Sequence, residues 1–268
     1  MRSLTNRGAT LVELTVALSL SAVMAVFLLG EAARPQRVVQ EMAVRSAGFS
    51  TLETAAQVFQ GELGGADPGD LLTATPDRVV YRATRATGTS CGLSSDGVRL
   101  IQAEFRGLRV PVPGRDSLAL PVRDTPSTWR MDYRPITGPL RSEVCPDGSA
   151  GLVIPATPGA AVAGVPLRVF EVMELRFYPS GGSWWLGARS VSAGENIQPV
   201  AGPFGSDGFL LELLDADGTA TVDPTQARLV RARLATESGD GQALGGSTRT
   251  FSRRDSLTIL VRLGSGQT

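Results

Sequence analysis

The sequence predicts an α+β protein in which one long N-terminal helix, its first half transmembrane and its second half amphipathic, packs on an antiparallel β-sheet head domain. Three observations support this class. An unbroken apolar run lies near the N-terminus, an apolar stripe of helical period follows it, and residues 66–268 alternate between turn clusters and β-branched or aromatic runs. Strands that follow a helix, rather than alternating with helices, favour an antiparallel α+β arrangement. Roughly 200 residues are enough for one sizeable core.

The apolar run extends from Ala9 to Gly30, and Glu13 is its only charged residue. As a helix it is about 33 Å long, enough to cross a hydrocarbon core of about 30 Å. Arg2 and Arg7 precede it with no acidic residue between them, which predicts a cytoplasmic N-terminus and export of the remainder. A carboxylate inside a membrane span costs roughly 2.5–3.5 kcal/mol on insertion scales, so Glu13 is a functional candidate.

Beyond this run, apolar residues recur at spacings that alternate between three and four, as on one face of a helix. The stripe consists of Val38, Met42, Phe49, Leu52, Ala56, Phe59 and Leu63. A glycine pair at 64–65 ends it, so we expect one helix over Thr10–Leu63, bent near Gly30 and Pro35. Such a helix fits an arrangement in which the first half faces lipid or a filament and the second half packs on a head domain. A plain membrane anchor followed by a linker helix is the alternative.

The remaining residues read as strands separated by turns. The expected strands are Arg78–Arg85, Val98–Phe105, Trp129–Ile136, Leu167–Tyr178, Ser183–Ser190, Phe209–Leu214, Arg228–Thr236 and Ser256–Leu263. Two segments, Tyr178–Ser183 and Asp215–Gly218, have the composition of hairpin turns.

The N-terminal segment Gly8-Ala9-Thr10-Leu11-Val12-Glu13-Leu14, preceded by a short basic stretch, resembles the class III signal of type IV prepilins and of type II secretion pseudopilins. The resemblance implies that residues 1–8 are a leader, that a prepilin peptidase cuts after Gly8, and that Ala9 becomes N-methylated. Glu13 would occupy the fifth mature position, where the family keeps a glutamate. The commonest first mature residue in the family is Phe, and Ala9 departs from it.

The same resemblance implies an organisation and a location for the mature chain. Residues 9–30 would be the transmembrane segment, 31–65 an amphipathic continuation, and 66–268 a β-rich head in the periplasm or outside the cell. The protein would be anchored in the inner membrane by a single span, and its partners would be other pilin or pseudopilin subunits.

Cleavage after Gly8 would also create an ammonium group at Ala9, and methylation would keep its charge. This cation is a partner for Glu13, either one turn away in the same helix or in a neighbouring subunit. Pairing across chains would make Glu13 a register device for assembly, because leaving one member of a buried pair alone costs about 3–5 kcal/mol. The alternative is an inert Glu13 near the lipid headgroups.

Later segments resemble, more loosely, minor pilins of the W type and J-type minor pseudopilins. The segments are Glu195–Ala201, Phe209–Gly218, Ala227–Leu234 and Asp255–Leu263, in that order. The resemblance implies a structural subunit of a pilus or pseudopilus. The mature chain expected after cleavage at Gly8 is large for a major subunit, which favours a low-copy position such as the filament tip over the repeating shaft.

Cys91 and Cys145 are the only cysteines, and in an exported protein they suggest a disulfide, with two separate buried thiols as the alternative. Two cysteines without histidine do not complete a zinc site. The chain has no His, and all of its 26 basic residues are Arg. The match of Gly88–Gly92 to G-x-S-x-G therefore lacks a base for its serine, and we expect neither an enzyme nor a cofactor.

Three weaker signals remain. Asp215, Asp217 and Asp223 are weak calcium candidates, but without the spacing of a calcium hand they more simply form turns. The adjacent Trp184 and Trp185 face opposite sides of a strand, so one of them can contact a partner. Net charge is zero and the pI is about 6.4, so we expect no nucleic-acid binding, although Arg228, Arg231 and Arg233 form a local basic run.

An ordinary secretory signal peptide is the competing interpretation of the N-terminus, with a cut at Ala32 or Ala33. It would make the mature chain an exported soluble binding protein or enzyme. Glu13 at the start of the apolar region and Pro35 just after the cut both count against it.

Overall fold

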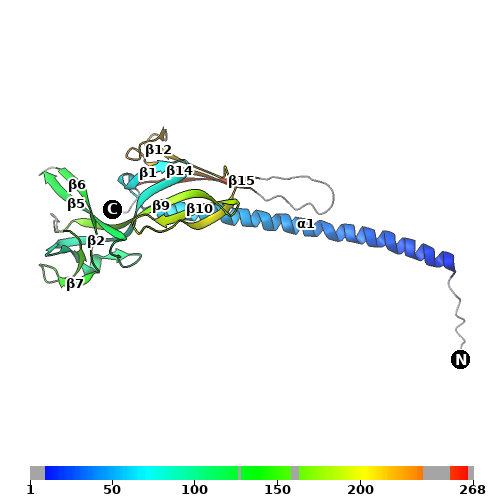
Figure 1. The fold of residues 1–268 in the computed structure, drawn as a ribbon, viewed down its shortest axis with the longest axis horizontal. Helices are drawn as coiled ribbons and strands as arrows, with labels where there is room; N and C mark the ends of the chain where they lie inside the picture. The colour runs from blue at the N-terminus through cyan, green and yellow to red at the C-terminus, as the bar shows by residue number, and fades with distance from the viewer. Residues whose placement is uncertain (1–9, 126–127, 158–162, 238–253, 265–268) are drawn as a thin grey trace, which may run out of the picture. The chain divides into compact units, whose positions relative to one another are not determined.

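The computed structural model describes residues 10–125, 128–157, 163–237 and 254–264 (Figure 1). Contacts divide the chain into two units, Met1–Phe49 and Ser50–Thr268. Helix α1 (Leu11–Leu63) forms the described part of the first unit, apart from Thr10, and its last turns belong to the second.

The second unit is built from strands joined by short turns and two single-turn 3₁₀ helices. The strands are β1 (Leu71–Thr75), β2 (Arg78–Ser94), β3 (Gly97–Ile101), β4 (Arg106–Gly107), β5 (Asp116–Thr125), β6 (Thr128–Pro135), β7 (Arg141–Val144), β8 (Ala150–Pro155), β9 (Pro166–Ser180), β10 (Ser183–Ser190), β11 (Gln198–Phe204), β12 (Phe209–Leu214), β13 (Ala220–Thr221), β14 (Leu229–Glu237) and β15 (Arg254–Arg262). The 3₁₀ helices are Pro68–Asp70 and Gln102–Glu104.

The predicted fold class is wrong. The protein is mostly β, with 52% strand and 21% helix. Its strands form two sheets, and the architecture is not that of a long helix packed on a single-sheet head domain. The β-rich unit takes in only Ser50–Leu63 of α1. The sequence understates the strand content because several strands carry weak signals; β5 contains Pro121, and β11 contains Pro199 and Pro203.

Both sheets are antiparallel where their strands pair. The larger has eleven strands with the central order β11-β10-β9-β2-β3-β8-β7, and the smaller has the order β13-β12-β14-β15. Strands β2 and β9 are the longest and pair from Arg78↔Arg176 to Thr89↔Pro166, with a bulge between Thr84 and Ala86. In Figure 1 these two strands link the two ends of the β-rich unit.

Expected and observed strands agree best where an apolar run is bounded by clear turn residues. Ser183–Ser190 and Phe209–Leu214 are confirmed to the residue. The turn between β9 and β10 consists of Gly181 and Gly182, both with positive φ, which a two-residue type I′ hairpin requires.

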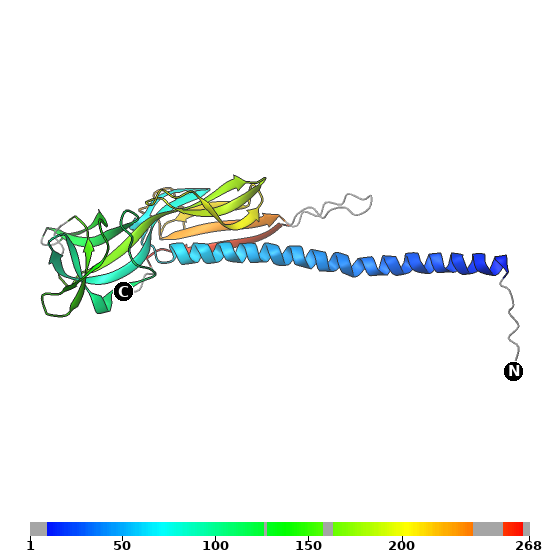
Figure 2. The ribbon, with the colours of Figure 1, turned by 60° about the horizontal axis from the view of Figure 1, so that its bottom comes forward.

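The main hydrophobic core lies where the last turns of α1 meet the inner faces of both sheets (Figure 2). Phe59 from the helix stacks on Phe209 at 5.6 Å, and Phe209 stacks on Phe177 at 5.3 Å. Phe177 also stacks on Trp184 at 5.0 Å. Helix and sheets are therefore joined by a continuous row of rings. A second core, around Leu100, lies among β2, β3, β5, β8 and β9.

The end of α1 is attached to β2 through polar groups as well. The buried Tyr81 donates a hydrogen bond of 2.8 Å from its hydroxyl to Glu62 in the last turn of the helix. Arg85 lies 3.5 Å from the same carboxylate. Burial and the Glu62 carboxylate raise the pKa of Tyr81 well above its usual value, so the hydroxyl stays a donor at neutral pH.

We expect Tyr81→Phe to lower the free energy of unfolding by about 1.5–3 kcal/mol, because the hydrogen bond to a charged acceptor is lost and a half-buried carboxylate oxygen loses one of its two partners. Urea unfolding of the full chain in detergent, followed by Trp fluorescence, measures this. Tyr178→Phe is the control, since its hydroxyl makes no hydrogen bond to the described residues and should cost little. Equal effects of the two substitutions would contradict the attachment.

Candidate functional site

The first turn of α1 holds Glu13 in a reciprocal hydrogen-bonded cap with Thr10. The backbone N–H of Thr10 donates to Glu13 Oε2 at 3.0 Å, and the backbone N–H of Glu13 donates to the Thr10 hydroxyl at 3.3 Å. This is a capping box, in which two N–H groups that the helix itself leaves unpaired are satisfied by side chains. The carboxylate also lies at the positive end of the helix dipole.

The cap gives Glu13 a local role that the sequence analysis missed, although the T-x-x-E pattern at Thr10–Glu13 is its known signature. The predicted cleavage and methylation sites, Gly8 and Ala9, lie outside the described residues. The pairing between the Ala9 amine and Glu13 therefore stays a prediction.

The helix surface after the cap is apolar on all sides. Over Leu11–Leu28 the mean hydropathy is 2.2, and none of these residues is buried within the protein. Large side chains are exposed along its length, at Leu11, Val12, Leu14, Val16, Leu18, Leu20, Val23, Met24, Val26, Phe27 and Leu28. Soluble monomers rarely expose an apolar surface of this extent. The segment is a candidate membrane span or signal sequence.

The apolar stripe behaves differently on the two sides of Ser50. Leu52, Phe59 and Leu63 are buried in the main core, as predicted for a packed face. Met42 and Phe49 remain 64% and 68% exposed. The expected packing face thus begins only where α1 enters the β-rich unit.

The predicted disulfide between Cys91 and Cys145 is present. It joins β2 to the turn between β7 and β8 and closes 54 residues of chain. A Cβ on Gly151 would come within 3.1 Å of the Cys145 sulfur, so this strand allows the bridge to pass close to its backbone.

A buried ionic cluster surrounds Glu171 on β9. Its carboxylate accepts hydrogen bonds from Arg85 at 2.9 Å, Arg109 at 3.1 Å and Arg115 at 2.5 Å. Arg109 also binds the buried Asp116 through both of its terminal nitrogens. Burial alone would raise the pKa of Glu171, but hydrogen bonds from Ser190 and the three arginines outweigh it and lower the pKa to about 2.

Sequence reasoning missed this cluster because its members come from β2, the β4–β5 segment and β9. The available signal was Glu171 and Glu174 inside an otherwise apolar strand. A buried carboxylate requires a cation, and both have one, since Arg189 donates to Glu174 at 2.7 Å. Both carboxylate oxygens of Glu171 accept hydrogen bonds from arginines, so the cluster is a structural clamp rather than an acid–base pair.

The nucleophile-elbow pattern does not form an elbow. Ser90 lies within β2 and is buried, and its hydroxyl contacts the backbone of Gly92. Its neighbour Cys91 is held in the disulfide. The strand–turn–helix geometry that exposes a nucleophilic serine is absent at this position.

The three aspartates considered for calcium sit in turns. Asp215 Oδ1 accepts from the N–H groups of Asp217 and Thr219, both at 2.9 Å. Asp223 accepts from Thr225, and these hydrogen bonds lower the pKa of Asp223. Across the described ranges, no group of three or more His, Cys, Asp or Glu side chains is placed to hold a metal.

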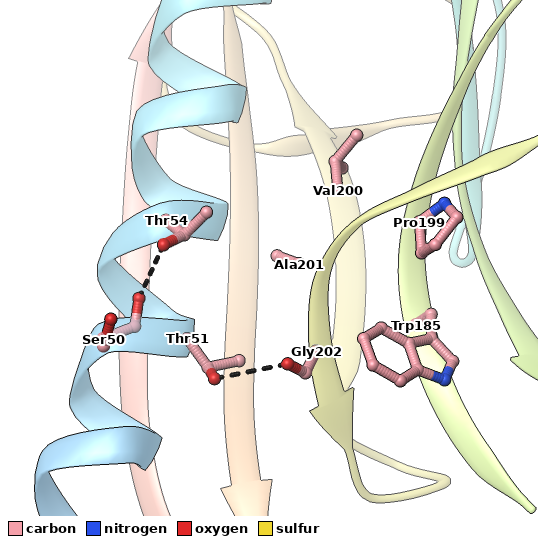
Figure 3. A pocket seen from close by; sticks show the side chains of 8 residues that line it. All are labelled: Ser50, Thr51, Thr54, Trp185, Pro199, Val200, Ala201 and Gly202. Atoms are coloured by element: carbon pink, nitrogen blue, oxygen red, sulfur yellow. Dashed lines mark hydrogen bonds between the residues drawn. The ribbon is translucent and has the colours of Figure 1, made fainter.

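A shallow pocket of about 320 Å³ lies between α1 and the edge strand β11 (Figure 3). Its hydroxyl groups come from the helix, and the Thr51 hydroxyl donates to the carbonyl of Gly202. Trp185 lines it, but the indole N–H already donates to the Ser180 carbonyl at 3.2 Å. With its polar groups largely bonded to one another, the pocket has little to offer a ligand. Trp184 is directed into the ring stack of the core.

The basic run on β14 is partly neutralised. Arg231 donates to Glu212 at 2.8 Å, Arg233 lies 3.5 Å from the same carboxylate, and Arg228 donates to backbone carbonyls.

No protein-family model, no curated protein and no solved structure matches this chain.

Proposed function

We propose that the chain is a prepilin-like structural subunit, a minor pilin or pseudopilin of a type IV pilus or a type II secretion pseudopilus, and not an enzyme. It would be processed after Gly8, anchored in the inner membrane with its β-rich unit in the periplasm, and assembled through α1. The observation that carries the proposal is the apolar helix surface of Leu11–Leu28, opened by the Thr10–Glu13 cap directly after the Gly8-Ala9 motif.

The physical argument concerns what covers that surface. In water, each fully exposed large apolar side chain forgoes roughly 1.5–3 kcal/mol of burial. Lipid satisfies an apolar helix before assembly, and neighbouring helices of the same kind satisfy it afterwards. The β-rich unit has its own core, so α1 up to Phe49 is available for this role.

The capping box makes it possible to test the charge of Glu13 separately from its capping hydrogen bond. Glutamine at this third helical position can still accept a hydrogen bond from the Thr10 N–H. Glu13→Gln therefore removes the charge and keeps the cap, whereas Glu13→Ala removes both. If the carboxylate pairs with the Ala9 amine of a neighbour, both variants should be processed normally and fail to assemble, since an unpaired buried charge costs about 3–5 kcal/mol per contact.

Sheared filament and membrane fractions from the host, probed by immunoblot, measure the assembled share. Assembly of Glu13→Gln at the wild-type level, with failure of Glu13→Ala, would reduce Glu13 to a helix cap. Normal assembly of both variants would show that Glu13 has no role in assembly.

The second candidate, an exported soluble protein released by ordinary signal cleavage, is favoured by the position of the apolar helix near the N-terminus. A cut near Ala33 would leave Leu52, Phe59 and the whole β-rich unit intact. Mass spectrometry of the N-terminus of protein purified from host membranes separates the two. Methylated Ala9 supports the subunit; a terminus near Arg34 overturns it.

A further inference from the structure

The two faces of the small sheet, whose strands β12, β14 and β15 are labelled in Figure 1, differ in character. Residues directly opposite one another on paired strands point to the same face. One face carries members of the main core, namely Leu211, Leu213, Val230, Ala232, Leu234, Ile259 and Val261. The other, called the outer face here, carries three rows of opposed residues: Leu214 with Leu229 and Arg262, Glu212 with Arg231 and Leu260, and Leu210 with Arg233 and Thr258.

Several side chains of the outer face are accessible. Leu260 is 56% exposed, and Thr258 and Arg262 are exposed as well. The side chains of Arg233 and Arg231 are 54% and 30% exposed. Leu260 lies opposite Arg231 and two residues from Arg262 on the same face. An accessible leucine is therefore flanked by arginines from two strands.

The three rows carry more positive than negative charge. Their one carboxylate, that of Glu212, accepts a hydrogen bond from Arg231 at 2.8 Å and lies 3.5 Å from Arg233. Arg262 forms no ion pair with any residue that the structure describes. Asp207 lines a hollow together with Arg233, so the Arg262 end of the face is the more positive of the two. The pair with Glu212 shows the kind of group that these arginines bind, a carboxylate.

The spacing of the arginines specifies the shape of a complementary partner. Arg262 and Arg233 lie two rows apart, which is four residues along the strands, or about 13 Å at about 3.3 Å per residue. Leu260 lies in the row between them. An extended chain places side chains i, i+2 and i+4 on one face at the same spacing. One turn of helix spans only about 5.4 Å. An extended segment with a carboxylate, an apolar residue and a carboxylate therefore matches the face.

The leucine also distinguishes a protein partner from other anions. The phosphates of a nucleic acid offer Leu260 no apolar contact. A membrane surface binds a face that carries several large apolar side chains, whereas in these three rows only Leu260 is more than half exposed among the large apolar residues. Charge and apolar contact together favour an acidic protein segment.

We propose that the outer face of the small sheet binds an extended acidic segment of another protein, with Arg262 and Arg233 holding carboxylates on either side of an apolar residue that contacts Leu260. Hydrogen bonds between guanidinium and carboxylate groups fix the two ends, and burial of Leu260 contributes apolar contact between them. The inference rests on three strands of the β-rich unit, so it is independent of the processing and assembly of α1.

Arginine footprinting of the full chain in detergent tests the proposal. Phenylglyoxal modifies guanidinium groups, the chain contains no lysine, and mass spectrometry assigns a rate to each arginine. The probe is the capped peptide Ser-Glu-Ser-Leu-Ser-Glu-Ser. At about 1 mM it should slow the modification of Arg262 at least about twofold, as expected for half-occupancy at a Kd of about 1 mM. Arg233 should be slowed by a smaller factor, and the exposed Arg106 on β4 should react at an unchanged rate.

Leu260→Ser tests the apolar contact, because it keeps both arginines as reporters. It should weaken binding at least about fivefold, so that the protection of Arg262 is lost. Val222→Ser is the matched control, since Val222 is 96% exposed and lies outside the three rows. Protection should persist in this variant. Protection that survives Leu260→Ser would overturn the proposal.

Control peptides separate the proposed partner from other anions. A peptide with lysine in place of both glutamates should not protect, and one with adjacent glutamates should protect less, because its carboxylates cannot reach both ends. No protection by the acidic peptide, or equal protection by either control peptide, would overturn the proposal. Equal protection by a single-stranded DNA oligonucleotide, or by mixed micelles containing phosphatidylglycerol, would assign the face to those anions and overturn it. Concentration-dependent protection of Arg262 without peptide would assign the face to a second copy and also overturn it.

Discussion

Replacing Glu171 by glutamine is expected to lower the free energy of unfolding by about 3–5 kcal/mol at neutral pH, because Glu171 is buried and three arginines lose the carboxylate that they share. Arg85, Arg109 and Arg115 converge on this one carboxylate from different segments. Urea unfolding of the full chain in detergent at pH 7 measures the change. Glu212→Gln, at a half-buried pair on the outer face of the small sheet, is the matched control and should cost under about 1 kcal/mol.

The same carboxylate predicts an acid-sensitive stability. Because the folded-state pKa of Glu171 is lowered to about 2, while the unfolded value is about 4.5, its contribution is fully present above the unfolded pKa. It should be lost as the pH falls from about 4.5 to about 2, and the shift corresponds to on the order of 3 kcal/mol.

The unfolding free energy of the wild type, measured between pH 5 and 2, should therefore fall more steeply than that of Glu171→Gln. If the unfolding free energies of the two proteins fell in parallel over this pH range, Glu171 would not contribute to the acid sensitivity.

Removing the disulfide is expected to have an effect of similar size. The bridge closes 54 residues, and in the chain-entropy model this constraint on the unfolded state is worth about 4 kcal/mol. The double variant Cys91→Ser and Cys145→Ser should unfold at correspondingly lower urea concentration than the oxidised wild type. The bridge joins β2 to the β7–β8 turn in the β2-β3-β8-β7 part of the large sheet, and neither cysteine belongs to the main core.

Wild type treated with a phosphine reductant is the control for this variant, since it loses the bridge and keeps both side chains. The two should agree within about 1 kcal/mol if the effect is that of the cross-link. A variant as stable as the oxidised wild type would show that the bridge contributes nothing to folding.

The sequence predicted local features whose cause lies within a few residues. The Gly181–Gly182 hairpin is an example, because only glycine adopts positive φ at both turn positions without strain. Strands β10 and β12 follow the same logic, since each is a short apolar run that begins directly after a glycine-containing turn. The helix end at Leu63, just before the Gly64–Gly65 pair, is a third case.

Features missed or misjudged depend on contacts between distant segments. Strand β5 forms despite Pro121 because β6 and β9 pair with it on its two sides, and β11 forms beside β10 although it contains two prolines. The arginine clamp on Glu171 needs strands brought together from positions up to 86 residues apart. Counting strands from local signals therefore produced the wrong fold class.

For the candidate site, the sequence by itself determined the apolar segment, the position of Glu13 at its start and the pair of cysteines, because each depends on composition and short spacing. Only the tertiary structure decided which part of the helical stripe is buried, how the buried carboxylates are neutralised, and that arginines from two strands share the outer face of the small sheet. These properties follow from which segments meet, and that is set by the packing of the whole core rather than by any local pattern.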